Sequence, residues 1–555
     1  MRKTVGSSGA CARGGEGNMQ HFKLPAGVRD VLPDLSGALD EAEALLRKKF
    51  AAAGFRSVRA AGLEYYDTLT KIGSAVDQAQ MFKMTDKDGN LIVLRPDMTL
   101  ACARIAATKL KGTRERLCYF SDIYDFSASG NADREVAQAG VELFGEEGAE
   151  ADAYAIAFAA DCLKALGLHD FIIDIGHVGF YKGLLEESGL SAAEAEELRG
   201  YINAKDMVST EMALRRTGAP ARVQQAILAL PSLFGGAEVL DAAERLTDNP
   251  LARASLDHLR AVYARLKESG AEKYVSFDLG TVKSLAYYSG IVFTGLAEGV
   301  GAPVLSGGRY DGLCAQFGRD LPAVGFAIGM MRALQAAGGS ARRTGKKGTV
   351  NVALAKGRLA SDCADVFCKC GVPAEILKEE TRKLVLETAD GRWRFFFVKP
   401  SDVPTYVEYG VADIGIVGKD TLLEAEADLY EMLDLKFESC KLCLAGFPGT
   451  PVDGVPHLRV ASKYARTAKK LFASRGAAAE VIELHGSIEL APLTGLADVI
   501  FDIVQSGATL RANGLVVLEE VFDISARLVA NKVSLKTKAA EILPLIASMK
   551  KYIEG

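Results

Sequence analysis

The residues best suited to chemistry lie in one stretch, residues 497–510, which reads ADVIFDIVQSGATL. Its first half has the β-branched and apolar residues of a buried strand, and its second half is a small polar turn centred on Gly507. Such a turn exposes successive backbone N–H groups beside the hydroxyls of Ser506 and Thr509, which suits a phosphate group. Asp502 precedes the turn, where it can reach a sugar hydroxyl. The stretch therefore predicts a site for a ribose 5-phosphate, although an ordinary strand-to-helix turn has the same features.

A second glycine-containing loop, residues 355–359 (AKGRL), follows a predicted strand and precedes a predicted helix. A short basic loop at a helix N-terminus is a general anion site, so Lys356 and Arg358 are candidates for contact with phosphate groups. A solvated loop is the alternative for both residues. Asp498 is a further catalytic candidate, for which a helix-end or salt-bridge role is the alternative.

The length of 555 residues exceeds what one core can hold, so two or three domains are expected. A net charge of −5 gives no indication of a nucleic-acid or membrane-surface partner, and no apolar run is long enough to cross a bilayer. Ten scattered cysteines are typical of a reducing cytosol, and a cytoplasmic location is expected. Cys440 and Cys443 lie in a predicted strand, and a zinc site would need four ligands at fixed spacing. No metal ligand is predicted among the side chains.

Two segments mark the domain boundaries. Residues 1–21 are rich in Gly and Ser and lack an apolar segment, which predicts a disordered leader rather than a signal peptide, with Met19 as an alternative start to Met1. Residues 336–348 are small, flexible and basic, which predicts a linker. We therefore expect one domain over residues 22–335 and another over residues 349–555.

The first domain has a helical pattern over residues 35–50, a hairpin signal at residues 88–90 and predicted strands at residues 117–120 and 136–144. Sequence blocks at residues 94–99 (LRPDMT), 138–145 (QAGVELFG), 306–313 (SGGRYDGL) and 323–332 (AVGFAIGMMR) occur in this order. This order resembles the catalytic domain of class II aminoacyl-tRNA synthetases, and histidyl-tRNA synthetase most closely. The resemblance implies an antiparallel sheet flanked by helices. It also implies a pocket for free histidine formed by Asp97, Thr99, Gln138, Glu142, Tyr287 and Tyr288.

The chemistry of that pocket is consistent, because carboxylates accept from ammonium and imidazole N–H groups and tyrosines pack against a ring. Strand polarity and core packing are the alternatives. The chain also departs from the synthetases: Asp125 stands where they carry an arginine for ATP, and Lys283 and Ala286 replace two other family residues. These departures are similar to those of the regulatory subunit of ATP phosphoribosyltransferase, which implies amino-acid binding without adenylation.

The second domain alternates predicted strands and helices, which favours a doubly wound α/β arrangement. Its blocks at residues 354–359 (LAKGRL), 399–406 (KPSDVPTY), 410–420 (GVADIGIVGKD), 486–492 (GSIELAP) and 505–515 (QSGATLRANGL) resemble the short form of ATP phosphoribosyltransferase. The resemblance implies two α/β lobes with a cleft between them, like a periplasmic solute-binding protein. The family's usual Glu-Thr-Gly is Gln-Ser-Gly here, and serine keeps the hydroxyl.

Together the two resemblances imply a feedback-regulated ATP phosphoribosyltransferase that forms N1-(5-phosphoribosyl)-ATP and pyrophosphate from ATP and phosphoribosyl pyrophosphate. Mg²⁺ is the expected cofactor, L-histidine the expected inhibitor and a homo-oligomer the expected assembly. The residues expected to bind phosphoribosyl pyrophosphate are Asp502, Ser506, Gly507, Ala508, Thr509 and Leu510. A first domain that acts only as scaffold or activator, a working histidine-activating synthetase, and a non-catalytic solute-binding module are the alternatives.

Overall fold

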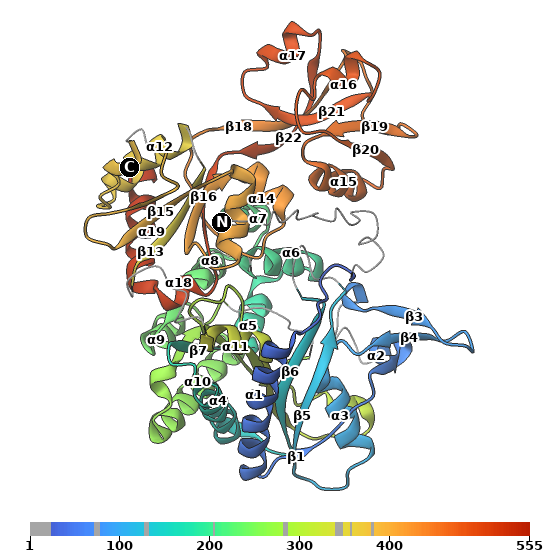
Figure 1. Ribbon diagram of the computed structural model, residues 1–555, viewed down its shortest axis with the longest axis vertical. Helices are drawn as coiled ribbons and strands as arrows, with labels where there is room; N and C mark the ends of the chain where they lie inside the picture. The colour runs from blue at the N-terminus through green and yellow to red at the C-terminus, as the bar shows by residue number, and fades with distance from the viewer. Residues whose placement is uncertain are drawn as a thin grey trace, which may run out of the picture.

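The computed structural model describes residues 24–71, 78–126, 133–203, 206–280, 287–338, 348–355, 358–378 and 382–554. The predicted leader, residues 1–21, lies outside the described residues. In Figure 1 the described residues form three bodies in a row: an N-terminal half at the bottom, an α/β lobe in the middle and a smaller α/β lobe at the top.

The N-terminal half is built on a nine-stranded sheet of order β1-β5-β6-β12-β11-β10-β7-β9-β8. Pairing is antiparallel from β5 to β7 in this order, which confirms the expected antiparallel sheet. The strands are β1 (Arg56–Ser57), β5 (Glu115–Tyr124), β6 (Glu135–Phe144), β7 (Phe171–His177), β8 (Phe234–Gly235), β9 (Val275–Asp278), β10 (Ile291–Ala297), β11 (Leu305–Arg309) and β12 (Ala323–Gly329).

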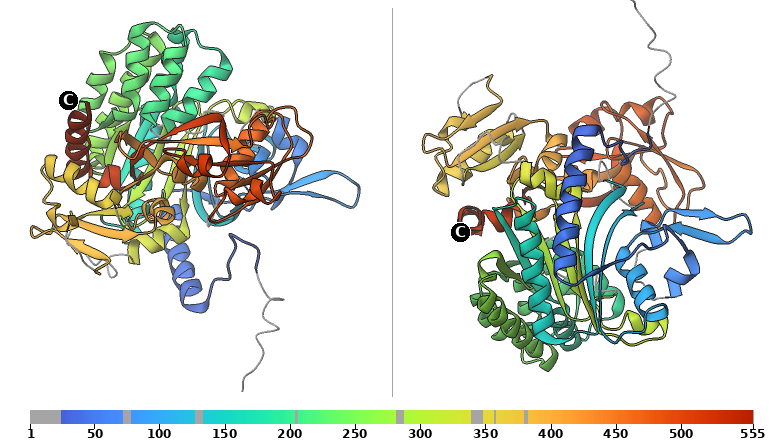
Figure 2. Two further views of the ribbon diagram at one scale, coloured as in Figure 1. Left: turned by 90° about the horizontal axis from the view of Figure 1, so that it is seen from above. Right: turned by 60° about the horizontal axis from the view of Figure 1, so that its bottom comes forward.

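Successive side chains along each strand point to opposite faces of this sheet, and each face has its own core. Val141 and Leu143 of β6 belong to the large core under helices α1 (Pro33–Ala52), α4 (Gly148–Ala165), α10 (Pro250–Ser269) and α11 (Met330–Gly338). Phe144 belongs to a second core, on the face covered by α3 (Met98–Thr108). Figure 2 (right) shows α1, in blue, lying along one face of the sheet. Residues with even numbers on β6 therefore point toward α3.

Local sequence signals explain where these helices begin and end. Asn249 caps α10 by accepting from the backbone N–H groups of Leu251 and Ala252, Pro250 follows at the first helical position, and Gly270 ends the helix at a φ of +69°. Helix α1 likewise begins at a proline, Pro33. Buried leucines on one face of α10 then hold it against the sheet.

Two smaller groups of elements complete this half. A three-stranded sheet consists of β2 (Leu63–Tyr65), β3 (Lys83–Thr85) and β4 (Leu91–Leu94), and its β3–β4 hairpin projects from the body in Figures 1 and 2. Helix α2 (Tyr66–Lys71) follows β2 in the chain. A run of helices lies between β7 and β9 in the chain: α5 (Val178–Ser188), α6 (Ala192–Asn203), α7 (Met207–Arg216), α8 (Ala221–Ala229) and α9 (Glu238–Glu244).

The middle body, lobe 1, has a six-stranded sheet of order β14-β15-β13-β16-β23-β17. Its strands are β13 (Val350–Ala355), β14 (Val385–Glu387), β15 (Trp393–Val398), β16 (Ile414–Gly418), β17 (Tyr430–Asp434) and β23 (Ala526–Ala530). Its helices are α12 (Arg358–Lys369), α13 (Val403–Glu408), α14 (Lys419–Ala425), α18 (Ser534–Thr537) and α19 (Ala539–Glu554).

The top body, lobe 2, has a five-stranded sheet of order β20-β19-β21-β18-β22. Its strands are β18 (Cys440–Gly446), β19 (Leu458–Ser462), β20 (Ala479–Glu483), β21 (Val499–Val504) and β22 (Val516–Ile524). Its helices are α15 (Ala465–Ser474), α16 (Leu490–Leu493) and α17 (Ala508–Ala512). Within residues 382–554 the chain crosses between the lobes twice, after β17 and after β22, so the two lobes expected for the second half are confirmed.

Lobe 1 is docked on the N-terminal half through buried polar contacts. The Asn531 amide donates across the contact to the carbonyl oxygen of Gly301 at 3.3 Å and, within lobe 1, to that of Val407 at 2.9 Å. Gly301 also passes so close to the main chain at Glu408 that a Cβ there would overlap the carbonyl oxygen. One hydrogen bond and a close backbone approach thus join the halves at this point.

The predicted elements match the structure closely, with one boundary difference. The predicted helix at residues 35–50 is α1, and the hairpin signal at residues 88–90 lies between the antiparallel strands β3 and β4. Residues 336–338, assigned to the linker, instead form the end of α11, because Ala336 and Ala337 pack against the core of the N-terminal half.

Candidate functional site

The predicted phosphate loop lies at the carboxyl end of β21 in lobe 2. Gly507 adopts a φ of +66° at the N-terminus of α17, a conformation that favours glycine. The Ser506 hydroxyl accepts from the N–H of Ala508 at 3.3 Å. Leu510 is buried and anchors the turn in the lobe 2 core, whereas Thr509 is exposed. The structure therefore has an open, glycine-centred turn at the predicted position.

This loop forms part of a pocket of about 600 Å³ between the two lobes. Four cationic side chains line it from both lobes: Lys436, Lys441, Arg511 and Arg527. The remaining lining residues are Asp434, Ser439, Cys440, Cys443, Val504, Gln505, Ser506, Gly507, Val517, Glu520, Asp523, Ile524 and Ser525. A cavity of this size, with convergent cations and hydroxyls, matches a small phosphorylated ligand.

Asp502 lies on β21 opposite Cys443, which lines the same pocket. The Asp502 carboxylate accepts from the N–H of Ile503 at 2.8 Å. Burial raises the pKa of Asp502, and the negative charge of Glu489 raises it further, while Lys463 opposes the shift. Asp502 is therefore a half-buried carboxylate near the phosphate loop, and its contact with the sugar stays a prediction from sequence.

Asp498 lies at the opposite end of β21 and is not brought to the loop. Its carboxylate is held by Arg459 at 2.7 Å and by the Arg459 backbone N–H at 2.9 Å. These hydrogen bonds hold the pKa of Asp498 below its usual value. Because the strand separates Asp498 from Ser506 by roughly 20 Å, the salt-bridge alternative fits and the catalytic assignment is not retained.

The second predicted anion loop is only partly visible. Lys356 lies outside the described residues. Arg358 is the first residue of α12, and its side chain also lies outside the described part. The assignment of both residues to phosphate contact therefore remains a prediction from sequence.

A second polar site lies on the α3 face of the sheet in the N-terminal half. Glu142 is fully buried on β6, where its carboxylate accepts from the Thr99 hydroxyl at 2.8 Å and from the Tyr310 hydroxyl. Burial, together with the negative charge of nearby Asp97, raises the pKa of Glu142 to about 8, although the two hydroxyl donors oppose the shift. Gln138 lies on the same face of β6, four residues before Glu142.

Asp97 and two tyrosines border this carboxylate. Asp97 accepts from the N–H of Leu100 at 2.8 Å and so caps α3, and burial raises the pKa of Asp97. The ring centroids of Tyr287 and Tyr288 are 4.6 Å apart, and Tyr287 meets Tyr310 edge to face. The structure therefore brings five predicted residues, Asp97, Thr99, Glu142, Tyr287 and Tyr288, into one cluster with Tyr310, while Lys283 and Ala286 lie outside the described residues.

Glycines on the neighbouring strands make room for these groups. A Cβ at Gly325 would overlap the Glu142 carboxylate, and a Cβ at Gly140 would overlap the Tyr119 hydroxyl. A Cβ at Gly308 would lie 2.6 Å from the Tyr288 ring. The sequence blocks around these glycines are thus explained by the space that the polar side chains need.

Sequence reasoning missed several pocket residues. Arg511 lies inside the sequence block at residues 505–515, so its positive charge next to the phosphate loop could have been recognised from the sequence. Lys436, Lys441 and Arg527 lie in or beside the two lobe crossings and carry no spacing signal. Tyr310, which reaches Glu142, lies in the quoted block at residues 306–313.

The described residues have neither a metal-binding cluster of side chains nor a membrane-spanning helix. They contain no group of three or more His, Cys, Asp or Glu side chains that could hold a metal ion. Cys443 lines the pocket, and burial raises the pKa of its thiol to about 11. None of the helices that the structure describes is both long and apolar enough to cross a membrane.

The fold and the two sites define a class of protein: a synthetase-type half docked on a two-lobed transferase half. The comparisons agree with this class. The histidyl-tRNA synthetase family model matches residues 27–333, and the ATP phosphoribosyltransferase family model matches residues 399–551.

Known proteins resemble each half separately. The ATP phosphoribosyltransferase regulatory subunit of Acetivibrio thermocellus is 41% identical over 57% of this chain and 77% of that protein. The ATP phosphoribosyltransferase of Caldanaerobacter subterraneus subsp. tengcongensis is 48% identical over 37% of this chain and 98% of that protein. A solved regulatory subunit/histidyl-tRNA synthetase from Bacillus halodurans is 32% identical, with a TM-score of 0.54 over 63% of this chain and 91% of that one.

The chain belongs to the ATP phosphoribosyltransferase family and carries a regulatory-subunit half and a catalytic half in one polypeptide. It is an ATP phosphoribosyltransferase of histidine biosynthesis, which joins N1 of the adenine of ATP to C1 of phosphoribosyl pyrophosphate and releases pyrophosphate.

Proposed function

We propose that the interlobe pocket is the site for phosphoribosyl pyrophosphate. The observation that carries this proposal is the meeting of four cations with a glycine-centred turn in one cavity. Residues 506–510 and Arg511 would hold the 5-phosphate, because backbone N–H groups, hydroxyls and a guanidinium all bind phosphate oxygens. Lys436, Lys441 and Arg527 would hold the pyrophosphate.

The chemistry needs little proton transfer. N1 of adenine attacks C1 of the ribose with its lone pair, the C1–N1 bond forms, and the C1–O bond breaks as pyrophosphate leaves with the electron pair. Positive charge develops on the sugar, and the Asp502 carboxylate would stabilise it. Lys356 and Arg358 would contact triphosphate or pyrophosphate oxygens, as the sequence predicts.

Mg²⁺ fits this site as an ion that enters bound to the pyrophosphate group of the substrate. In proteins it keeps several waters and is commonly bound through substrate phosphates with one or two carboxylates. Glu520 and Asp523 are pocket carboxylates that would complete its shell. When bound, the ion would neutralise charge on the leaving pyrophosphate.

The decisive test is phosphoribosyl-ATP formation by the purified full chain with Mg²⁺. Arg511→Gln and Lys436→Gln should each raise KM for phosphoribosyl pyrophosphate about tenfold, with a smaller effect on KM for ATP. Unchanged KM values in both variants would show that the substrate binds elsewhere.

We also propose that the polar cluster of the N-terminal half binds L-histidine and inhibits catalysis. Two acidic side chains, the half-buried Asp97 and the buried Glu142, with hydroxyls and aromatic rings beside them, suit the ammonium and imidazole groups of that ligand. Calorimetry with L-histidine should give a defined site that Glu142→Gln abolishes, together with loss of inhibition. Catalysis indifferent to histidine would instead favour a scaffold or activator role, and histidine-dependent ATP–pyrophosphate exchange would favour a working synthetase.

The assembly is part of the same proposal. The domain division at residues 22–335 and 349–555 remains our expectation, with residues 336–338 added to the first domain as the end of α11. We also expect a homo-oligomer, because a linker alone does not transmit a signal and packed contacts must do so. Light scattering of the purified chain gives its oligomeric state directly.

A further inference from the structure

Helix α14 stands where the three bodies meet. Its first residue, Lys419, places its ammonium group 3.4 Å from Asp206 of the N-terminal half. Its second residue, Asp420, accepts from the Tyr464 hydroxyl of lobe 2 at 2.8 Å. Further along, Glu424 accepts from the N–H of Thr467 at the start of α15. The N-terminal half therefore reaches, through one short helix, the place where the lobes touch.

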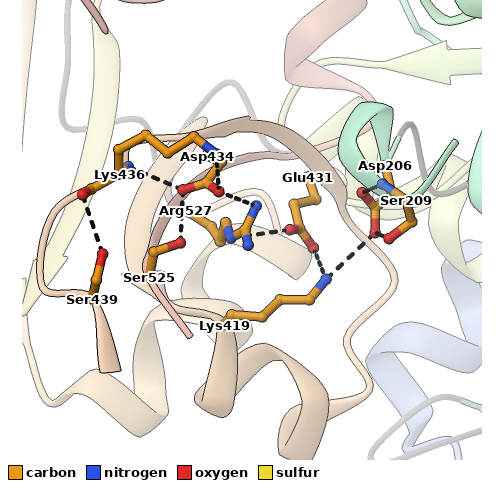
Figure 3. A network of polar contacts seen from close by, with 9 residues as sticks. All are labelled: Asp206, Ser209, Lys419, Glu431, Asp434, Lys436, Ser439, Ser525 and Arg527. Carbon is orange, nitrogen blue, oxygen red and sulfur yellow. Dashed lines mark hydrogen bonds and ion pairs between the residues drawn. The ribbon is translucent and has the colours of Figure 1, made fainter. Parts of the chain in front are cut away.

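A line of alternating charges runs from Asp206 into lobe 1, as Figure 3 shows. Lys419 lies 2.5 Å from Glu431 on β17. Glu431 in turn lies 3.5 Å from Nε of Arg527, whose Nη1 lies 3.2 Å from Asp434. All of these side chains except that of Lys419 are at most 10% exposed. Buried ion pairs of this kind are screened little by solvent.

The far end of this line is the pocket wall. Arg527 and Asp434 line the interlobe pocket, and so does Lys436, whose ammonium group is 2.8 Å from Asp434. Ser525 donates to the same Asp434 carboxylate at 2.7 Å. The two cations on this wall are thus oriented by Asp434 and, for Arg527, also by Glu431.

We propose that Asp206 is a positioning residue for the catalytic pocket: it holds Lys419, Lys419 holds Glu431, and Glu431 with Asp434 holds Arg527 at the pocket wall. The N-terminal half thereby completes the catalytic half. This inference rests on the proposed binding of phosphoribosyl pyrophosphate in that pocket.

The expected sign of the effect separates positioning from bulk charge. Removal of the Asp206 charge makes the region more positive, which by itself would favour an anionic substrate and lower its KM. Loss of positioning acts the other way, because Lys419 then pairs with Glu431 alone and weakens the hold of Glu431 on Arg527. A rise in KM is therefore the mark of positioning.

Asp206→Asn is the sharpest variant. Asp206 also caps α7 by accepting from the N–H of Ser209 at 2.9 Å, and asparagine caps helices equally well. The variant keeps the cap and loses the charge that Lys419 meets. The Ser209 hydroxyl, which donates to the second carboxylate oxygen of Asp206 at 2.7 Å, can instead accept from the asparagine amide. Glu146→Gln is the matched control, since Glu146 is a half-buried acid paired with Arg116 at 2.8 Å inside the N-terminal half.

The experiment measures kcat and KM for both substrates on the full chain with Mg²⁺. Asp206→Asn should raise KM for phosphoribosyl pyrophosphate roughly three- to tenfold with kcat within about twofold. Asp206→Glu keeps the charge and should have a KM for phosphoribosyl pyrophosphate close to that of wild type. The double variant of Asp206→Asn with Lys419→Met should have a KM no higher than that of Lys419→Met alone. A thermal midpoint within about 2 °C of wild type confirms folding.

Contrary outcomes are distinguishable. A KM that is unchanged or lowered in Asp206→Asn, or additive effects in the double variant, overturns the inference. If Arg511→Gln and Lys436→Gln also leave this KM unchanged, the pocket assignment fails and the inference falls with it. If those two variants raise KM while Asp206→Asn does not, the pocket assignment stands and the positioning role alone is wrong.

Discussion

The ammonium group of Lys536, in the C-terminal half, lies 2.5 Å from a carboxylate oxygen of Asp278 in the N-terminal half. Both side chains are at most 3% exposed, and Asp174 lies 3.5 Å from the same ammonium group. Lys536 also lies 3.8 Å from the centre of the Phe234 ring. A lysine of α18 is thus enclosed by groups from β7, β8 and β9, and the docking of lobe 1 depends on it.

Lys536→Met should strongly destabilise the chain, because it leaves two buried carboxylates of the other half without this cation. Removal of one partner of a buried ion pair typically costs about 3–5 kcal/mol. The single tryptophan, Trp393, lies buried in lobe 1, so its fluorescence reports unfolding of that lobe. The urea midpoint of Lys536→Met should fall well below that of the control variant Lys378→Met, which removes an exposed ion pair with Asp365. Equal midpoints for the two variants would contradict the role of Lys536.

Glu142 should make stability depend on pH. Burial raises the pKa of Glu142 from 4.5 to about 8, so between these values the folded chain holds a proton that the unfolded chain has lost. Stability from this group therefore falls as pH rises, by at most about 1.4 kcal/mol per pH unit. Glu142→Gln removes the effect. The thermal midpoint of this variant, relative to that of wild type, should therefore rise as pH is raised from about 5 to 8. Parallel curves for the two proteins would refute the shift.

Asp502 and Asp498 should differ sharply when each is changed to asparagine. Asp502→Asn removes the carboxylate beside the phosphate loop and should lower kcat about 10²–10³-fold. Asp498→Asn weakens a partly exposed ion pair with Arg459, so activity should stay within about twofold and stability should change by less than about 1 kcal/mol. A large loss of kcat in the Asp498 variant would return that residue to the active site.

Gly301→Ala should disturb the contact between the halves. A Cβ at this position would overlap the Glu408 carbonyl oxygen, so the backbones must move apart. We expect weaker inhibition by histidine with at least partial catalysis retained, measured as the histidine concentration that halves turnover. Gly312→Ala is the control, because a Cβ at Gly312 meets nothing within 4 Å. Unchanged inhibition in Gly301→Ala would mean that the signal takes another route.

Local patterns predicted most of the fold. The helix at α1, the strands β5 and β6, and the alternation of strands and helices in the second half follow from periodicity and turn residues, which act over short stretches of chain. The meeting of Thr99 with Glu142, 43 residues apart, was predicted only because both lie in sequence blocks of a known family.

The rest depends on contacts between distant segments. Asp206 and Lys419 are 213 residues apart, and Asp278 and Lys536 are 258 apart, so no spacing in the sequence links them. Asp498 was proposed beside Asp502 as a residue for the ribose hydroxyls, whereas the structure pairs it with Arg459 at the other end of β21, the salt-bridge role that was its alternative. Strand β21 carries the two residues away from each other, and only the direction of the strand decides which of them meets the substrate.

The docking of Gly301 against Glu408 joins surfaces that belong to one polypeptide. Their encounter is intramolecular, with an effective concentration on the order of millimolar for a short tether. Two separate subunits part when they are diluted, whereas these surfaces stay in a fixed one-to-one ratio at any expression level. A cell that makes this chain therefore needs no matched synthesis of regulator and catalyst, and dilution does not separate the two halves.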